Sequence, residues 1–297
     1  MPQHPIAPVG IAPAVVAWFA HAARPLPWRA ADVSPWAVLV SEFMLQQTQV
    51  ARVQPRWAEW VRRWPTPAAL AAEPASEAVR AWDRLGYPRR ALWLHRAATE
   101  IVERHGGEVP RDLDALLGLQ GIGPYTARAI AAFAFGDRHP VVDTNTRRVI
   151  ARAVDGAAEA GAPATARDLA AMEQLLPTDR EAAHRFNAGA MELGATVCTA
   201  RSPRCDACPI ADLCAWRAAG YPAYDGPRRT KQARFEGSDR QARGMVMREL
   251  RAAHRPVARE ELARLLDDDA RLERAVEGLV ADGLAVRTNG GYALPDT

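Results

Sequence analysis

Apolar residues recur at three- and four-residue spacing from residue 11 to about residue 220, which is the period of amphipathic helices. Prolines stand between these stretches, as in "WPTPAAL", where a proline can begin a helix but not continue one. No sustained alternation of period two occurs before the last dozen residues. The pattern therefore predicts an all-α fold, with its clearest helices at 13–23, 37–53, 90–105, 126–135 and 146–154.

The pattern changes near residue 225. Residues 225–238 are basic, contain glycines and have little apolar content, so we expect a linker there. Residues 239–297 predict three helices and then two short strands around Asn289–Gly290, a strong hairpin signal. This order is typical of a small winged-helix-like α/β module. Because its charges nearly cancel, we expect it to pack on the chain or contact a protein partner rather than bind DNA.

Composition narrows the class of protein. With 297 residues, 48% of them hydrophobic and 25% charged, the chain has room for two or three globular domains. No apolar run reaches the length of a membrane span, and the first ten residues lack a secretory signal, so we expect a cytoplasmic protein. Lys231 is the only lysine among 38 basic residues, so a mechanism that needs a lysine amine has almost no candidate.

All four cysteines fall within 17 residues, at Cys198, Cys205, Cys208 and Cys214, in the spacing C-x6-C-x2-C-x5-C. Disulfides do not suit a cytoplasmic chain, where thiols stay reduced. Four-cysteine zinc sites usually have two C-x2-C pairs, and only one is present. Four thiolates on short loops favour a [4Fe–4S] cluster over zinc. The spacing alone does not exclude a zinc site.

Two further stretches have both a functional and an ordinary interpretation. In "LQGIGPY", Gly121 and Gly123 permit positive φ, Pro124 suits a first helical turn, and amides at a helix start can bind an anion. A plain helix–turn–helix corner would look the same. In "HPVVDTNTRRV", Asp143 precedes a helix that begins near Thr146, and a helix cap is the ordinary interpretation.

Glu42 lies in "WAVLVSEFMLQQTQV", a predicted helix that is apolar on nearly every face. Burial disfavours the charged form of a carboxyl group, so we expect a raised pKa and a usable general acid. The alternatives are a buried glutamate that a partner satisfies, or an exposed position.

These motifs carry a resemblance to a known family. The cysteine spacing and "LQGIGPY" resemble the endonuclease III/MutY superfamily of DNA glycosylases, and "SEFMLQQTQV" is similar to its MutY adenine glycosylases. The resemblance covers residues 15–224 and implies a two-lobed helix-hairpin-helix core. It implies a six-helix domain at residues 29–136 and an iron–sulfur domain at residues 1–28 and 137–224. The linker at 225–238 and the module at 239–297, which the pattern predicts, follow.

The resemblance also implies a reaction. The enzyme would be a monofunctional glycosylase of base excision repair that hydrolyses the N-glycosidic bond of adenine opposite 8-oxoguanine or guanine. Glu42 would protonate adenine at N7, and Asp143 would stabilise the cationic sugar, as carboxylates do in sugar hydrolysis. Tyr125 and Asn145 would help to position these groups and the attacking water. Bifunctional relatives carry a lysine at the place of Tyr125.

The resemblance assigns DNA contacts as well. Gln47 and Tyr87 would wedge into the duplex when the base leaves the stack. The glycine turn and the loop with Arg201 and Arg204 would contact phosphate, and "RPLPWR" would line the adenine pocket with Arg24, Leu26, Trp28 and Arg29. That last stretch could instead be only a buried tryptophan beside a surface arginine. We expect a monomer that acts on mispaired double-stranded DNA at the bacterial nucleoid and contacts no membrane.

The chain departs from the family pattern in three places. Pro88 replaces a second tyrosine, and Ala188 replaces a polar residue expected beside the adenine. Residues after 224 show no Nudix-like pattern, so the preference for 8-oxoguanine over guanine stays open. An endonuclease III-like pyrimidine glycosylase with lyase activity is the nearest alternative, against which the missing lysine and Glu42 argue. A non-catalytic iron–sulfur DNA-binding protein is another, but it would not need Glu42 and Asp143.

Overall fold

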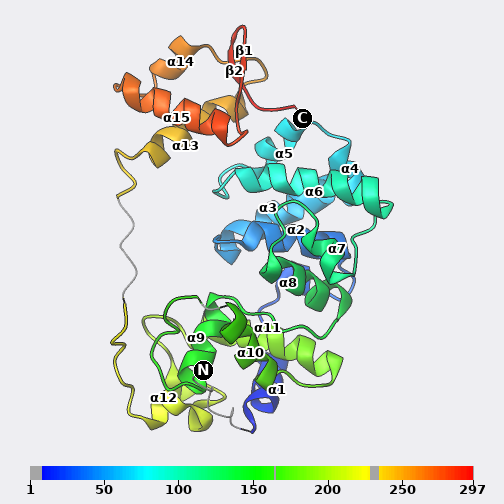
Figure 1. The fold of residues 1–297 in the computed structure, drawn as a ribbon, viewed down its shortest axis with the longest axis vertical. Coiled ribbons are helices and arrows are strands. Elements are labelled where there is room, and N and C mark those ends of the chain that lie inside the picture. The colour runs from blue at the N-terminus through cyan, green and yellow to red at the C-terminus, as the bar shows by residue number, and fades with distance from the viewer. Residues whose placement is uncertain (1–8, 164, 228–233, 297) are drawn as a thin grey trace. The chain divides into compact units, whose positions relative to one another are not determined.

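The structure is a computed structural model that describes residues 9–163, 165–227 and 234–296. The first ten residues, from which we expect no secretory signal, and the centre of the predicted linker, with Lys231, lie largely outside these ranges. Within them the chain is helical apart from one short hairpin, which confirms the predicted fold class (Figure 1). None of the helices in the described ranges combines the length and apolar character that a membrane span requires.

The contacts between residues divide the chain into two compact units. Unit 1 contains residues 1–38, 111–117 and 122–229, and unit 2 contains residues 39–110, 118–121 and 230–297. Unit 1 thus takes in α8 (Pro124–Phe135), which the predicted boundaries put with the six-helix domain. The reason is that α8 packs against residues around Val141 and Met191. Unit 2 takes in the C-terminal module.

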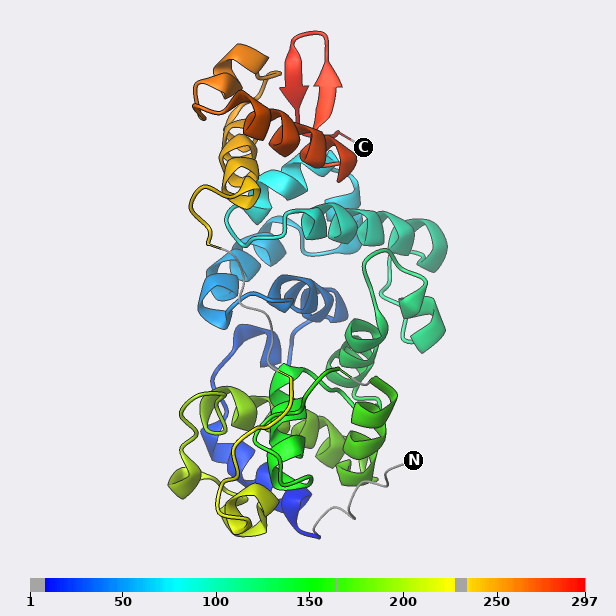
Figure 2. The ribbon, with the colours of Figure 1, turned by 60° about the vertical axis from the view of Figure 1, so that its left-hand side comes forward.

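Unit 1 is built around α11 (Arg180–Thr196). Both α1 (Ile11–Ala22) and α9 (Thr144–Ala153) pack on it, and the three helices share one apolar core (Figures 1 and 2). Gly189 makes the α1 contact possible, because a Cβ there would lie 2.8 Å from the Val15 side chain. The remaining elements of the unit are η1 (Pro27–Arg29), α7 (Leu113–Leu117), α10 (Thr165–Leu175), η2 (Cys205–Ala207), η3 (Ala211–Leu213) and α12 (Ala215–Ala218).

Unit 2 places α4 and α5 on α6. Three fully buried tryptophans, Trp60, Trp64 and Trp82, pack edge-on, with centroid separations from Trp60 of 4.6 and 5.7 Å. The predicted single helix at 37–53 is wrong, because Gln47 adopts a φ of 56° that no right-handed helix accepts. Two helices flank that residue. The helices are α2 (Pro35–Leu45, begun in unit 1), α3 (Val50–Arg63), α4 (Pro67–Ala71), α5 (Ala75–Trp82) and α6 (Arg89–His105).

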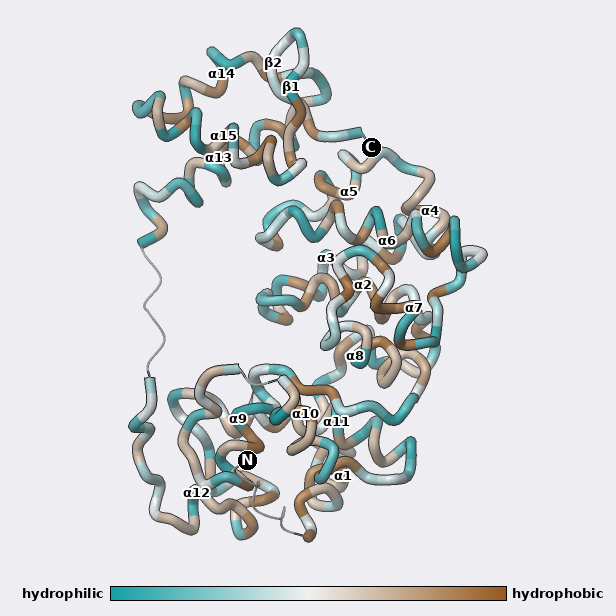
Figure 3. The backbone as a smooth tube through the Cα atoms, viewed as in Figure 1, coloured by the Kyte–Doolittle hydropathy of each residue, from teal (hydrophilic) through white to brown (hydrophobic). Residues whose placement is uncertain are grey.

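The C-terminal module has the winged-helix-like order that the sequence predicts. It contains α13 (Asp239–Ala252), α14 (Arg259–Ala263), α15 (Asp269–Ala281), β1 (Val286–Thr288) and β2 (Gly291–Ala293). Both α13 and α14 pack on α15, which carries hydrophilic and hydrophobic residues in turn along its length without a strict order (Figure 3). Val257 pairs with Tyr292 as a one-residue third strand. Gly291 has a φ of 129°, and a Cβ there would lie 2.0 Å from the Val257 oxygen, so the wing requires glycine.

Candidate active site and iron–sulfur loop

Asp143 is the N-cap of α9, as its ordinary interpretation predicts, and its second oxygen is also bound. One carboxylate oxygen accepts the Thr146 amide at 2.7 Å, and the other accepts the side-chain amide of Asn145 at 2.8 Å. The side chain is half-buried. A carboxylate held from two sides has one fixed orientation, which a group that must stabilise charge at one point requires.

A chain of hydrogen bonds continues from Asp143 to the cysteine loop. Arg148 donates to Asn145 Oδ1 at 2.8 Å, to the Gly194 carbonyl at 2.6 Å and to the Cys198 carbonyl at 2.7 Å. A Cβ at Gly194 would lie 2.7 Å from the Asn145 Cβ, so glycine lets α11 approach α9 here. Asn145 is therefore fixed by its neighbours on both elements.

Asn187 orients the segment before Asp143, and the sequence analysis did not single it out. It is fully buried on α11, accepts the Val141 amide at 3.0 Å and donates to the His139 carbonyl at 3.0 Å. A buried amide must satisfy both its donor and its acceptor, and this extended segment provides both partners. A lone asparagine in an otherwise apolar helical stretch was the available signal.

Tyr125 lies in the first turn of α8, directly after Pro124. Its half-buried ring packs against a small apolar cluster of Ala129, Ala132 and Val141. Because Val141 stands two residues before Asp143, α8 and the segment that carries Asp143 are part of one packed group. Nearby Ala188, the predicted departure from the family pattern, is buried on α11 at 5% exposure.

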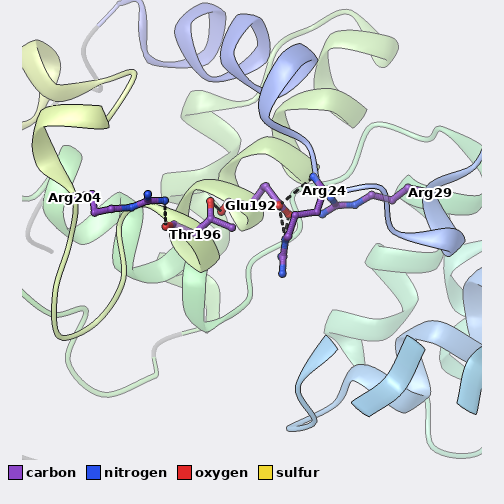
Figure 4. A network of polar contacts seen from close by, with 5 residues as sticks. All are labelled: Arg24, Arg29, Glu192, Thr196 and Arg204. Carbon is purple, nitrogen blue, oxygen red and sulfur yellow. Dashed lines mark hydrogen bonds and ion pairs between the residues drawn. The ribbon is translucent and has the colours of Figure 1, made fainter. Parts of the chain in front are cut away.

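Glu192 joins the "RPLPWR" stretch to α11 and is a second residue that the sequence analysis missed. Its fully buried carboxylate accepts Arg24 Nε at 2.5 Å, Arg24 Nη2 at 3.0 Å and Arg29 Nη2 at 3.0 Å (Figure 4). Burial alone would raise the pKa of Glu192, but the hydrogen bonds and charges of the two arginines outweigh it and hold the pKa below its ordinary value. Leu26 is buried and Trp28 is half-buried in the same stretch.

Glu192 thus fixes where the two arginines point. Arg29 also lies over the Phe19 ring at 5.3 Å, and its Nη1 is buried without a partner among the described residues. One donor of this guanidinium is therefore available to a ligand. The signal in the sequence was a single acidic residue within "FNAGAMELGA", the same kind of signal that identified Glu42.

The four cysteines line one pocket of unit 1, together with Arg152, Ile210 and Trp216. Buried Arg152 donates to the Cys198 sulfur at 3.3 Å and lies 4.6 Å from the Trp216 ring centroid. Burial raises the pKa of the Cys208 thiol to about 11. A bound metal centre is the positive charge that turns such thiols into thiolates.

The donor set fits an iron–sulfur cube. A four-iron cube takes its four thiolates from around a pocket, and the four cysteines line one pocket. Arg201 and Arg204 in the same loop are exposed, and Arg204 also donates to the Thr196 carbonyl at 2.8 Å (Figure 4).

In unit 2, Glu42 is buried in α2 at 6% exposure, as its sequence surroundings predict. Its neighbours Ser41 and Phe43 are fully buried, so the helix is covered on more than one face. A carboxyl group in this position is screened from water, and the exposed alternative is excluded.

Gln47 and Tyr87 are both exposed and both have positive φ, 56° and 49°, which non-glycine residues rarely adopt. Buried Arg90 connects their loops. It donates to the Phe43 carbonyl at 2.8 Å, to Thr48 Oγ1 at 3.0 Å, to the Gly86 carbonyl at 3.1 Å and to the Gln46 carbonyl. Burial lowers the pKa of Arg90 to about 10. The two loops are therefore fixed to one side chain that the sequence analysis did not identify.

The glycine turn is only partly as predicted. Gly121 has a φ of 80°, and a Cβ there would lie 2.8 Å from the Trp93 Cβ and 3.0 Å from the Phe43 ring, so glycine is required. Gly123 instead has an ordinary φ of −94° as the N-cap of α8, which corrects the expected positive φ. No atom of the described residues lies within 4 Å of its Cβ position, which leaves the backbone there open to a partner.

Comparison with known proteins identifies the family. The HhH-GPD superfamily of base excision DNA repair proteins matches residues 40–173, and the iron–sulfur binding domain of endonuclease III matches residues 198–214. An adenine DNA glycosylase from Mycobacterium tuberculosis (strain CDC 1551 / Oshkosh) is 56% identical over 283 residues, 95% of this chain and 92% of that protein. The chain belongs to the MutY-type family of adenine DNA glycosylases. A family member from Mycolicibacterium smegmatis is 52% identical over 282 residues, 94% of each chain.

Membership of the MutY-type family confirms the predicted class of enzyme. The chain is a DNA glycosylase of base excision repair with DNA as its partner, which excludes the non-catalytic alternative. Its cofactor is a [4Fe–4S] cluster, as the cysteine spacing predicts, rather than zinc or disulfides. The structure of a thermostable thymine-DNA glycosylase has a similar fold, with a TM-score of 0.63 at 27% identity over 70% of this chain and 95% of that one.

Proposed function

We propose that the chain hydrolyses the N-glycosidic bond of adenine mispaired with 8-oxoguanine or guanine and leaves an abasic site. The observation that carries the proposal is its pair of carboxyl groups in different surroundings. Glu42 is buried in α2 and screened from water, and Asp143 is half-buried and hydrogen-bonded from two sides. The identity to adenine DNA glycosylases supports adenine as the base that is released.

The two carboxyl groups would divide the reaction between them. Glu42 donates its proton to N7 of adenine, the bond from the sugar to the base breaks, and its electron pair leaves with the base. Asp143 stabilises the positive charge that develops on the sugar. Water then adds to the sugar and loses a proton. Asn145 fixes the Asp143 carboxylate, and Tyr125, packed beside Val141, positions the water.

The shortage of lysine supports a monofunctional enzyme. A lyase step needs an amine that forms a Schiff base with the sugar, and Lys231 is the only lysine of the chain. Tyr125 stands where the bifunctional relatives carry that lysine. We therefore expect no strand cleavage without alkali.

The DNA contacts are part of the same proposal. Exposed Gln47 and Tyr87 wedge into the duplex, and the backbone at Gly121 and Gly123, with Arg201 and Arg204, contacts phosphates. The pocket for the everted adenine contains Arg24, Leu26, Trp28 and Arg29, whose free Nη1 supports a contact to the base.

The remaining proposals concern the whole chain. We infer a monomer at the bacterial nucleoid, with the domain boundaries given above, and a protein partner for the C-terminal module. The near-neutral charge of that module and its exposed Val286 support a protein contact over a phosphate contact. How strongly 8-oxoguanine is preferred to guanine is the quantity that the following measurement determines.

The test is single-turnover cleavage of duplexes that hold adenine opposite 8-oxoguanine, guanine, cytosine or thymine, read with and without alkali. We expect adenine release opposite the first two, strand breaks only after alkali, and losses of about 100-fold or more in Asp143→Asn and Glu42→Gln. Strand cleavage without alkali, or pyrimidine release, would favour the endonuclease III-like alternative. Full activity in both variants would overturn the proposed roles.

A further inference from the structure

Helix α5 lies between α3 and α6 of the core and the C-terminal module within unit 2. Its Ala78, Val79 and Trp82 positions are fully buried, and the helix packs on α6. Its other face meets the C-terminal module. Ser76 Oγ donates to Asp296 Oδ1 at 3.1 Å, and the Ala75 amide donates to the Asp296 carbonyl at 3.3 Å. The module therefore rests on a helix of the glycosylase core.

Two arginines exchange hydrogen bonds where α5 and α13 end. Arg80 of α5 donates to the carbonyls of Leu250 and Arg251, which would otherwise lack partners at the end of α13. Arg251 of α13 donates in return to the Asp83 carbonyl, at 2.6 Å, directly after α5. Burial lowers the pKa of Arg251, because its charge lies between the elements rather than in water.

Asp83 needs such support. Its φ of 46° and ψ of −120° are unfavourable for a residue with a Cβ, and such a conformation persists only where the surroundings fix it. Its amide donates to the Arg80 carbonyl at 3.2 Å, and its carboxylate accepts Arg56 Nη2 at 2.7 Å. The contact to its carbonyl comes from the C-terminal module, through Arg251.

Tyr87 lies in the loop that starts at Asp83. Between them, Trp82 Nε1 donates to the Gly86 carbonyl at 2.9 Å, and Tyr87 itself is 56% exposed. Beyond it, Arg89 pairs with Asp282 at the end of α15, at 3.3 Å. The module thus contacts the wedge loop, residues 83–89, on both sides of Tyr87.

Some arginines of the module pair with carboxylates of the module itself. Arg243 pairs with Asp282, Arg255 with Glu261 and Arg274 with Asp239. Such pairs reflect a module whose positive and negative charges nearly balance, so its net attraction for phosphate is small. The contacts of the module therefore favour a role toward the protein core.

We propose that the C-terminal module positions the wedge loop. Arg251 is the positioning residue, because it holds the backbone at Asp83, where the loop that carries Tyr87 begins. The inference rests on the proposed role of Tyr87 in base eversion. The module would then raise the rate at which adenine leaves the stack without touching DNA itself. It would stiffen the core segment that enters the duplex.

The test uses the full-length, cluster-loaded protein and the duplex with adenine opposite 8-oxoguanine. We expect Arg251→Ala to slow single-turnover release about tenfold and Arg251→Lys to recover part of the loss. Arg248→Ala is the matched control, because Arg248 lies on the same helix, is 59% exposed and pairs with the neighbouring Glu249. We expect it to stay within about twofold of the wild type.

A double mutant separates positioning from general damage. If Arg251 acts through Tyr87, Arg251→Ala should slow adenine release less than about twofold in a protein that already carries Tyr87→Ala. The reason is that both substitutions remove the same contribution to the rate. Losses that multiply, or an Arg251→Ala rate equal to that of Arg248→Ala, would overturn the inference. A Tyr87→Ala protein with full activity would instead contradict the proposed wedge.

Hydrogen exchange provides a readout that does not depend on adenine release. Arg251→Ala should speed exchange at residues 84–87 and leave the cluster loop unchanged, since that loop lies in unit 1. Unchanged exchange at residues 84–87 would reject the positioning role even if the rate of base release fell.

Discussion

Glu192 shows how one side chain can be buried and charged at once. It is fully buried, and Arg24 and Arg29 supply the donors that offset the cost of burial. Both arginines belong to the stretch proposed to bind adenine. A single carboxylate therefore links the stability of unit 1 to the shape of the proposed pocket.

We predict that Glu192→Gln destabilises the protein by about 2–3 kcal/mol near neutral pH. The figure is below that for a fully buried pair, because the Arg24 and Arg29 side chains remain 38% and 26% exposed. The pKa of Glu192 is lowered in the folded state, so its contribution is present above the ordinary carboxyl pKa and is lost as the pH falls through the folded value.

Urea unfolding of the two proteins at a series of pH values measures this contribution. The difference between wild type and Glu192→Gln should be largest near neutral pH and shrink in acid. A difference that stays constant with pH would show that the loss comes from packing rather than from charge.

At the scale of elements, Arg90 connects the loop after α2 with the loop before α6. Its donors satisfy carbonyls from both, so Gln47 and Tyr87 hold their unusual backbone conformations together. The sequence presents Arg90 as one of two adjacent arginines in "YPRR" and does not distinguish the buried one. Only the packing of α6 against the loop after α2 shows which of the two is structural.

Arg90→Met should therefore weaken both loops at once. The side chain keeps its length but leaves buried carbonyls without donors, which costs about 3 kcal/mol or more. We expect lower thermal stability and at least about tenfold slower adenine release. Arg96→Met on the same helix is the control, since Arg96 is 58% exposed and pairs with Glu100 on the surface. Equal effects of the two substitutions would contradict the connecting role.

At the scale of the whole molecule, each unit contributes a different part of the proposed reaction. Unit 1 holds Asp143, the arginine stretch and the cysteines, whereas unit 2 holds Glu42, the wedge residues and the C-terminal module. The cysteine loop packs on the apolar core of unit 1 through Cys198, Cys208, Ile210 and Leu213. Loss of the cluster should consequently disturb unit 1 first.

Cys208→Ser checks this expectation. We predict loss of the iron–sulfur absorbance and faster hydrogen exchange at residues 198–214 and in α9 and α12, with less change in unit 2. Binding to undamaged duplex should also weaken and become less sensitive to salt, because Arg201 and Arg204 lose their fixed positions. A uniform rise in exchange over both units would show instead that the cluster stabilises the whole chain.

The sequence by itself determined the features that depend on short spacing or on residue type. The cysteines fall within 17 residues, so their spacing favoured the cluster over zinc before the family resemblance implied it, and the scarcity of lysine limited the chemistry. The helical period predicted the all-α core, and Asn289–Gly290 predicted the hairpin. The same period missed the break at Gln47, because apolar residues recur on both sides of it.

Only the tertiary structure decided which distant residues meet. Glu192 and Arg24 are 168 positions apart, and Arg251 and Asp83 likewise. Such pairs depend on which helix faces pack together, and the hydrophobic period shows that a face is buried without showing against what. The buried Asn187, Arg90 and Glu192 therefore became functional candidates only when their partners were known. The C-terminal module likewise acquired a proposed role only through its contacts with α5.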